Sequence, residues 1–257
     1  MKFIILGCGS SMGVPRSDGF FGKCNPNNKK NFRSRCSALI QGKSENILID
    51  TSPDLRSQLL NNKIKNINRV FFTHMHADQT NGINDLRIFS LKSKKKIPIY
   101  ADVITKKYLK NSFSYCFDQD KEYPAILEFK KMKKKFIFEK TININPIKVK
   151  HGTIDSLSFI INNKIAYLPD ANEIYKKDLD KFRNLEYIII DCLRYTKHPS
   201  HFNLPDVLDL NLLLKPNKMI LTNLHSDLDY KKLLDILPKN IKPAYDGLSI
   251  KIDNEKK

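Results

Sequence analysis

The feature that most constrains this chain is residues 73–79, with the sequence Thr-His-Met-His-Ala-Asp-Gln. The segment follows residues 69–72, a short apolar run that predicts a buried strand. Two imidazoles one residue apart, with a carboxylate two residues further on, can converge on one small volume if the segment is a loop leaving that strand. Chemistry in α/β proteins is found at such strand ends. We therefore expect His74, His76 and Asp78 to bind metal.

The remaining histidines lie in similar places. The chain has six in all, and the other four lie at or beside the end of an apolar run or next to a turn signal: His151, His198, His201 and His225. Asp170 follows the apolar run 165–168 in the same way. A shared site at one edge of a sheet requires polar, metal-competent groups at the ends of several strands. This pattern weighs against the simpler interpretation of two neighbouring surface histidines.

The order His-x-His-x-Asp, then a distant His, an Asp that ends a strand and a last His, resembles the metallo-β-lactamase superfamily. Residues 6–15, Leu-Gly-Cys-Gly-Ser-Ser-Met-Gly-Val-Pro, together with Arg35-Cys36-Ser37 and the strand that ends at Asp50, resemble its phosphoribosyl 1,2-cyclic phosphate phosphodiesterase branch. The resemblance covers nearly the whole chain. It implies an α+β fold, a four-layer αββα sandwich with mostly antiparallel and mixed sheets.

Size and composition agree with that fold. A chain of 257 residues that is 41% apolar can bury one large core, so we expect a single domain over residues 1–257. The five cysteines include no Cys-x-x-Cys pair, which argues against a disulfide framework or a thiolate zinc site. No run approaches the roughly 18 apolar residues of a membrane span, and the N-terminus does not resemble a signal peptide. We expect a cytoplasmic protein with no membrane partner.

The net charge of +18 has two interpretations. Such a field attracts polyanions and phosphorylated substrates. The chain is also rich in Ile and Asn, as Lys-rich chains of biased composition tend to be, so the charge is equally compatible with composition alone. The lysine clusters near residues 92–96 and 130–135 are interpreted as solvated turns.

Apolar periodicity and turn residues predict the regular elements. The expected strands are 2–6, 36–41, 46–50, 69–72, 97–100, 156–161, 164–168, 187–190 and 219–223, with antiparallel alternation from 126 to 150. The expected helices are 53–60, 82–91, 175–182 and 204–214.

The first glycine-rich loop, residues 7–22, does not resemble a dinucleotide fingerprint, because Val14 and Pro15 stand where a helix should begin. We expect it to bring backbone close to the metal site, with Ser10, Ser11 and Arg16 either as contacts to a substrate phosphate or as ordinary turn residues. In the related phosphodiesterases the following segment carries clustered cysteines for a structural zinc. Only Cys24 remains here, so no structural zinc is expected.

The resemblance also implies a ligand set. His74, His76 and His151 would hold one ion, and Asp170 would bridge to a second ion held by Asp78 and His225. Asp50 would support the histidine loop from behind. The ions would be Zn²⁺ or Mn²⁺, with Fe as a further candidate.

Gln79 departs from the superfamily, which usually has a histidine there. Because an amide oxygen is a weak ligand, two alternatives stay open: a dinuclear site with altered metal preference, or one tight ion with Gln79 as a weak ligand at most. The expected catalytic residues are His201, which would protonate the leaving group, and Asp78. Arg194 would hold a phosphate oxygen or pair with Asp191, and His198 is interpreted as a surface residue.

We therefore predict a metal-dependent hydrolase that cleaves phosphodiesters, with a small cyclic ribose phosphate as substrate. An RNA-processing nuclease of the tRNase Z type is the second candidate. Nucleic acid is the less favoured partner, because the interval from Asp170 to His225 has no room for the long arm with which tRNA-processing relatives grip tRNA. A non-catalytic binding protein with a degenerate metal site is a third candidate, and a homodimer is one option for the assembly.

Overall fold

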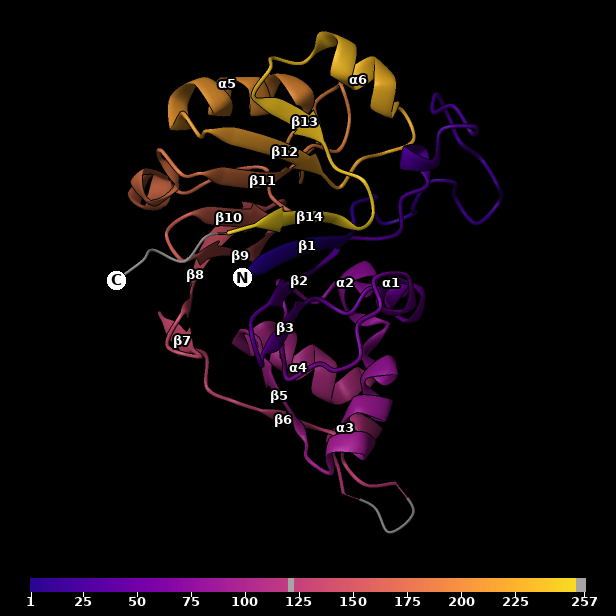
Figure 1. Ribbon diagram of the computed structural model, residues 1–257, viewed down its shortest axis with the longest axis vertical. Coiled ribbons are helices and arrows are strands. Elements are labelled where there is room, and N and C mark those ends of the chain that lie inside the picture. Colours follow the sequence, from indigo (N-terminus) through magenta and orange to yellow (C-terminus); the bar gives the residue numbers. More distant parts are fainter. Residues whose placement is uncertain (120–122, 253–257) are drawn as a thin grey trace.

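The computed structural model describes residues 1–119 and 123–252. Two seven-stranded sheets lie face to face, and helices cover the outer face of each sheet (Figure 1). The result is four layers, helix, sheet, sheet and helix. The predicted α+β fold class is confirmed.

The first sheet has the strand order β14-β1-β2-β3-β4-β5-β6. Its strands are β1 (Lys2–Gly7), β2 (Ser37–Gln41), β3 (Asn46–Ile49), β4 (Arg69–Phe71), β5 (Ile97–Tyr100), β6 (Leu127–Phe129) and β14 (Leu248–Lys251). Pairing is antiparallel from β14 to β3 and parallel from β3 to β6. The prediction of antiparallel strands from residue 126 is wrong for β6, which joins β5 in parallel, because three residues carry too short a pattern to indicate a partner.

The second sheet has the strand order β13-β12-β11-β10-β9-β8-β7. Its strands are β7 (Phe136–Phe138), β8 (Ile142–His151), β9 (Ile154–Ile161), β10 (Ile165–Leu168), β11 (Tyr187–Asp191), β12 (Lys218–Thr222) and β13 (Ile241–Pro243). Pairing is antiparallel from β7 to β10 and parallel from β10 to β13. Both sheets are therefore mixed, as predicted.

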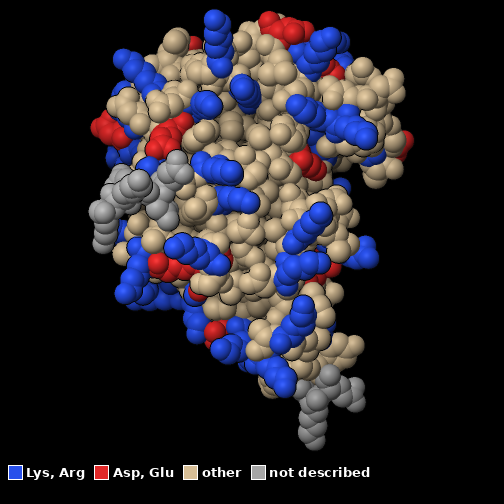
Figure 2. All heavy atoms as spheres, in the orientation of Figure 1, with Lys and Arg blue, Asp and Glu red and all other residues tan. Residues whose placement is uncertain are grey.

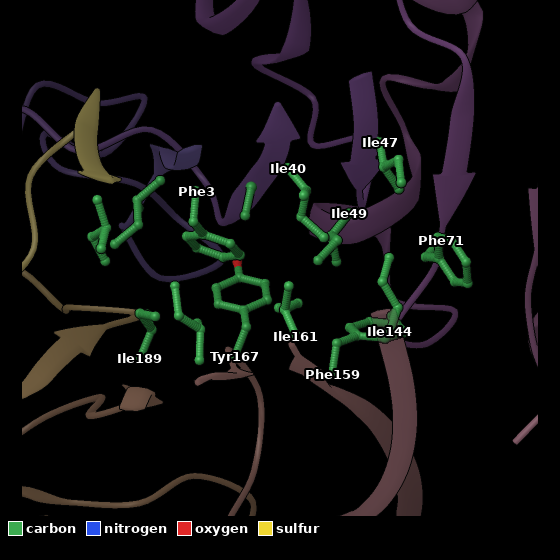
Figure 3. Close-up of a cluster of buried hydrophobic side chains, with 14 of the residues drawn as sticks. Phe3, Ile40, Ile47, Ile49, Phe71, Ile144, Phe159, Ile161, Tyr167 and Ile189 are labelled. Carbon is green, nitrogen blue, oxygen red and sulfur yellow. The ribbon is translucent and has the colours of Figure 1, made fainter. Parts of the chain in front are cut away.

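The facing sides of the two sheets form the central core (Figure 3). Phe3 of β1 meets Tyr167 of β10 with ring centroids 5.4 Å apart, and Phe71 of β4 meets Phe159 of β9 at 5.6 Å. Edge and tilted contacts of this kind add to the stabilisation that comes from burying the rings. This packing fixes the edges of the two sheets relative to each other.

Helices cover the outer faces through two further apolar clusters. The α-helices are α1 (Leu55–Asn61), α2 (Ala77–Thr80), α3 (Arg87–Ser93) and α4 (Val103–Ser112) beside the first sheet, and α5 (Leu204–Leu214) and α6 (Tyr230–Ile236) over the second (Figure 1). The 3₁₀ turns are η1 (Lys29–Asn31), η2 (Ile83–Leu86), η3 (Ser114–Cys116) and η4 (Lys176–Phe182). Among the described residues, no helix has both the length and the apolar character to cross a membrane.

The predicted helices agree with the structure to different degrees, depending on the local structure at each helix start. The bounds of α5 match the predicted 204–214, because Asn203 and Asp206 form a capping box that marks its start. The predicted helix 82–91 begins as the 3₁₀ turn η2 before α3, and the segment 175–182 is the 3₁₀ turn η4. Helices α2, α4 and α6 were not predicted.

A buried arginine ties the loop after β1 to the loop after β12. The side chain of Arg33 is only 2% exposed, and its guanidinium donates to Leu228 O at 2.7 Å, Asn31 Oδ1 at 3.1 Å and His225 O at 3.4 Å. The backbone N–H of Ser10 donates to Leu224 O at 3.3 Å. These bonds fix the loop that carries Ser10 at one edge of the sandwich.

Candidate metal centre

Polar side chains from several strands meet at one edge of the second sheet. Strands β10, β11 and β12 are parallel, so the residues at their carboxyl ends, Asp170, Asp191 and Asn223, lie on the same side. Strand β8 runs in the same direction as β10, because both are antiparallel to β9, and it ends at His151. The loop after β4 brings His74 and His76 to this edge from the first sheet.

Three imidazoles converge at the centre of this edge. His74 Nε2 lies 2.8 Å from His76 Nδ1, and His151 Nε2 lies 3.3 Å from the same atom. Burial, reinforced by the neighbouring histidines, lowers the pKa of His74 well below its usual value and lowers that of His151 to about 4. Both rings are therefore neutral near pH 7, which is the form that binds metal. The three nitrogens suit one divalent ion.

Hydrogen bonds from behind hold two of these rings. The Thr73 hydroxyl lies 3.0 Å from His74 Nδ1 and donates to Asp50 Oδ2 at 2.8 Å, while the Thr73 backbone N–H donates to Asp50 Oδ1 at 2.7 Å. His151 Nδ1 donates to Ser200 O at 2.7 Å. Partners of this kind set the orientation of metal-binding histidines. Asp50 thus reaches the histidine loop through Thr73.

A second group of possible ligands comprises His151, Asp170 and His201. His201 Nδ1 is 2.6 Å from Asp191 Oδ2. Burial lowers the pKa of His201, but the carboxylates, led by Asp191, outweigh burial and raise its pKa to about 9. Burial also raises the pKa of Asp191 to about 6, so the pair is an imidazolium and a carboxylate near pH 7. The sequence prediction had considered Arg194 as a partner of Asp191.

Two amides surround Asp170. Gln79 Nε2 donates to Asp170 Oδ2 and to Asp78 Oδ2, both at 3.1 Å, and Asn223 Nδ2 donates to Asp170 Oδ1 at 3.0 Å. Gln79 Oε1 is buried without a hydrogen-bond partner among the described residues. Asp78, half-buried, lies in the first turn of α2.

The role of His225 as a ligand stays a prediction. His225 lines the pocket but belongs to neither group of converging ligand atoms, and its Nδ1 accepts from the backbone N–H of Asp227 at 3.4 Å. The chain turns immediately after β12, where Asn223 has a φ of +59°. Asn223, two residues earlier, therefore makes the contact with Asp170.

The other predicted residues lie around the rim. Ser10 and Ser11 both line the pocket, and Ser10 is 3% exposed with its hydroxyl unpartnered among the described residues. Arg194 lines it too, but its guanidinium donates to the carbonyl oxygens of Thr196 and Lys197, at 3.1 and 2.6 Å. His198 is a half-buried residue of the lining, with its ring 5.0 Å from that of His201.

The cavity over these residues has a volume of about 360 Å³. A neighbouring cavity of about 600 Å³ shares Ser11, Met12 and Asp78 with it and is also lined by Arg16 and Arg35. Arg35 Nε lies 2.9 Å from Asp54 Oδ2, and its two Nη groups donate no hydrogen bond to another described residue.

Sequence reasoning considered Asp191 only as a partner of Arg194 and assigned no role in the site to Asn223 or Arg35. Asp191 and Asn223 end apolar strands, as Asp170 nearly does, so their position was a usable signal. Arg35 lies in a polar, basic stretch that carries no periodic pattern.

Residues 45–223 match the family described as Beta-lactamase superfamily domain. The structure is similar to that of a diphosphatase of the PhnP family, with 29% sequence identity and a TM-score of 0.90 over 98% of each chain. It is also similar to human tRNase Z, short form, with 16% identity and a TM-score of 0.67 over 98% of this chain and 100% of that one. The second likeness concerns the fold alone.

A curated relative from Porphyromonas gingivalis (strain ATCC BAA-308 / W83), named octanoyltransferase, is 29% identical over 261 residues. The match covers 99% of this chain and 52% of the relative. The chain thus spans about half the length of that protein.

Proposed function

The chain belongs to the beta-lactamase superfamily of hydrolases, and from that membership we propose that it hydrolyses phosphodiesters in a metal-dependent reaction, with a small cyclic ribose phosphate as substrate. The observation that carries the proposal is the convergence of His74, His76 and His151 beside Asp170, in a pocket that His201 also lines. The likeness to a diphosphatase supports chemistry at phosphorus.

The donor set fits a divalent ion. Neutral imidazoles with a carboxylate suit Zn²⁺ or Mn²⁺, and Fe²⁺ accepts the same ligands. His74, His76 and His151 would hold the ion, with Asp170 next to them. When bound, such an ion polarises a phosphoryl oxygen and makes water a better nucleophile near neutral pH.

His201 is the proposed proton donor to the leaving group. Asp191 engages its Nδ1, so Nε2 is the nitrogen that can hand over a proton. The buried carboxylate keeps the ring charged and fixes its orientation, which are the two requirements for a general acid. The proton then leaves on the departing oxygen, and the neutral ring is ready to take one back from water.

The neighbouring cavity supports a phosphorylated substrate. Arg35 lines it directly beside the metal pocket, and guanidinium groups bind phosphate oxygens in a two-point geometry. Arg16 lines it too, but its Nε and Nη2 donate to Asp18. A substrate whose reacting phosphate lies over the histidines can therefore extend a second anionic group towards Arg35.

A nuclease remains the second candidate because of the net charge of +18. Figure 2 shows Lys and Arg scattered over the visible face, with few Asp and Glu between them. The positive charge of this face forms no single stripe along which a nucleic-acid backbone would run. Turnover that weakens steeply with salt would favour the nuclease.

Octanoyl transfer is not proposed for this chain. The residues that line the pocket are mainly His, Asp, Ser, Arg and Asn, with Met12 and Leu193 as the apolar members. A site for an eight-carbon chain is expected to be predominantly apolar. The five cysteines are buried as well, so no thiol is presented in the pocket.

The test is an assay of chelator-treated protein with and without added Zn²⁺ or Mn²⁺, on bis(p-nitrophenyl) phosphate, 2′,3′-cyclic nucleotides and a cyclic ribose phosphate. We expect turnover only with metal and the highest kcat/KM on the cyclic ribose phosphate. Absence of turnover on every phosphodiester at full metal loading would count decisively against the proposal.

A further inference from the structure

The carboxylate of Asp170 is already engaged on both of its oxygens by amide N–H groups. Asn223 Nδ2 donates to Oδ1 at 3.0 Å, and Gln79 Nε2 donates to Oδ2 at 3.1 Å. The same Gln79 nitrogen donates to Asp78 Oδ2 at 3.1 Å, so it bridges the two carboxylates. Gln79 is wholly buried and Asn223 is 2% exposed, so water does not compete for these bonds.

The surroundings fix the orientation of the Asn223 amide. Its Nδ2 also donates to the Pro169 carbonyl oxygen at 2.8 Å. A reversed amide would place Oδ1 against both that carbonyl and the Asp170 carboxylate, so two attractive contacts would become repulsive. Asn223 therefore presents N–H groups to this part of the pocket, and N–H groups do not bind cations.

The orientation of the Gln79 amide is fixed in the same way, by the groups around it. Reversal would turn its oxygen towards the carboxylates of Asp78 and Asp170, although its buried Oε1 has no partner among the described residues in the present orientation. Leaving a buried amide oxygen unpaired costs free energy. The two carboxylates outweigh that cost because bonds to charged acceptors are the stronger ones.

The two halves of the pocket therefore differ in kind. One half offers three imidazole nitrogens that converge on a single point. The other offers the carboxylates of Asp78 and Asp170, bridged by an amide. Of the imidazoles in this half, His201 is hydrogen-bonded to Asp191 through Nδ1 and keeps only Nε2 for an ion, and His225 Nδ1 lies 3.4 Å from Asp227 Oδ2. An ion there would have to displace two hydrogen-bonded amides and would gain weak neutral ligands in return.

We propose that this pocket holds one tightly bound divalent ion, and that Gln79 and Asn223 are positioning residues that hold Asp78 and Asp170 where a second ion would otherwise do so. The inference rests on the proposed function only in using the same pocket. Of the two alternatives that the sequence left open, a dinuclear site or one tight ion, the proposal selects the second and gives Gln79 the role of a hydrogen-bond donor.

Metal content tests this directly. The full chain is equilibrated with Zn²⁺ in the presence of a competing chelator that removes weakly held ions, and bound metal is counted by native mass spectrometry. We expect one ion per chain in the wild type and two in the double variant Gln79→His, Asn223→His, which supplies imidazole at both amide positions. Asn81→His is the matched control, because it adds an exposed histidine at the end of α2 and is expected to stay at one ion.

Manganese gives a second readout that does not depend on activity. The electron paramagnetic resonance spectrum of the Mn²⁺-loaded wild type should show an isolated ion, and that of the double variant a spin-coupled pair. If the double variant does not fold, the single variant Asn223→His replaces it in both measurements. We expect this variant to bind a second ion more tightly than the wild type does.

The possible results distinguish a failure of this inference from a failure of the proposed function. Two tight ions in the wild type would overturn this inference and leave the proposed function intact. One ion in the folded double variant would overturn the role given to the amides. No bound ion in the wild type would overturn both proposals, whereas one ion without phosphodiester turnover would support this inference and defeat the proposed function.

Discussion

His201 Nδ1 and Asp191 Oδ2 lie 2.6 Å apart, and no part of the Asp191 side chain is exposed to solvent. The carboxylate is also held by the backbone N–H of Ala171 at 3.0 Å. A buried acid fixed in this way both orients the imidazole and favours its charged form. In the proposed reaction, Asp191 would act on the substrate through His201 without contacting the reacting atoms itself.

Asp191→Asn should therefore slow the reaction in a way that depends on the leaving group. For a substrate with an alkoxide leaving group, kcat should fall by about 10²–10⁴-fold, which is the usual contribution of general acid catalysis. For p-nitrophenolate, which needs little protonation, the loss should be far smaller. Metal content should not change. Equal losses on both substrates would contradict the assignment, and His201→Ala should show the same split.

Thr73→Val should weaken metal binding. The substitution keeps the shape of the side chain but removes the hydroxyl that links Asp50 to His74. Loss of such a supporting bond lowers metal affinity by about 10–100-fold. Competition with a chromophoric chelator measures the change. Ser90→Ala is the control and should keep wild-type affinity, because it removes a hydroxyl of α3 that donates to Lys95 O, away from the histidines.

Arg35→Ala should affect substrate binding more than turnover. If its Nη groups hold a second anionic group of the substrate, KM for a phosphorylated cyclic ribose should rise by about 10–100-fold, the equivalent of one lost charge-assisted bond. Kinetics on bis(p-nitrophenyl) phosphate, which lacks that group, should stay near the wild type. The exposed Arg56→Ala provides the comparison. An equal rise in KM on both substrates would argue against a second anion position.

Arg33→Met should lower the free energy of unfolding by about 2–4 kcal/mol, because it leaves buried acceptors on Leu228 and Asn31 without their donor. Urea denaturation measures the effect. Arg56→Met, on the exposed surface of α1, should change stability little. If Arg33→Met left the free energy of unfolding unchanged, the loop after β1 would not depend on this guanidinium for its stability.

The raised pKa of the buried Asp246 carboxyl predicts that the stability of the fold depends on pH. Burial raises its pKa from 3.8 to about 6, although Ser34 and Cys8 donate to the carboxylate. The pKa of Asp246 is higher in the folded chain than in the unfolded chain. Its contribution to the free energy of unfolding is therefore fully present below pH 3.8, the ordinary pKa, and is lost as the pH rises through about 6. The loss should approach about 3 kcal/mol.

The difference in unfolding free energy between the wild type and Asp246→Asn, measured by denaturant titration at several pH values, should follow this loss. The wild type should become less stable relative to the variant as the pH rises. The exposed Asp235→Asn should show no comparable trend. A difference that stays flat from pH 4 to pH 7 would mean that Asp246 titrates alike in the folded and unfolded chains.

The sequence by itself determined the strands and the edge at which the site lies. Alternating or continuous apolar runs predict strands because side-chain direction along a strand is a local property, and polar residues directly after those runs mark the strand ends. His74, His76, His151 and Asp170 were found in this way. The apolar run 204–214 similarly predicted α5, and the structure shows a capping box at Asn203 where that helix begins.

Only the tertiary structure decided which residues complete the site. Asn223, in a left-handed backbone conformation directly after β12, donates its amide to Asp170. The pairing of His201 with Asp191, and the amide of Gln79 between two carboxylates, join strands and loops that lie far apart in the sequence. Local patterns place a residue at a strand end, whereas the direction of its side chain there follows from the packing of the two sheets.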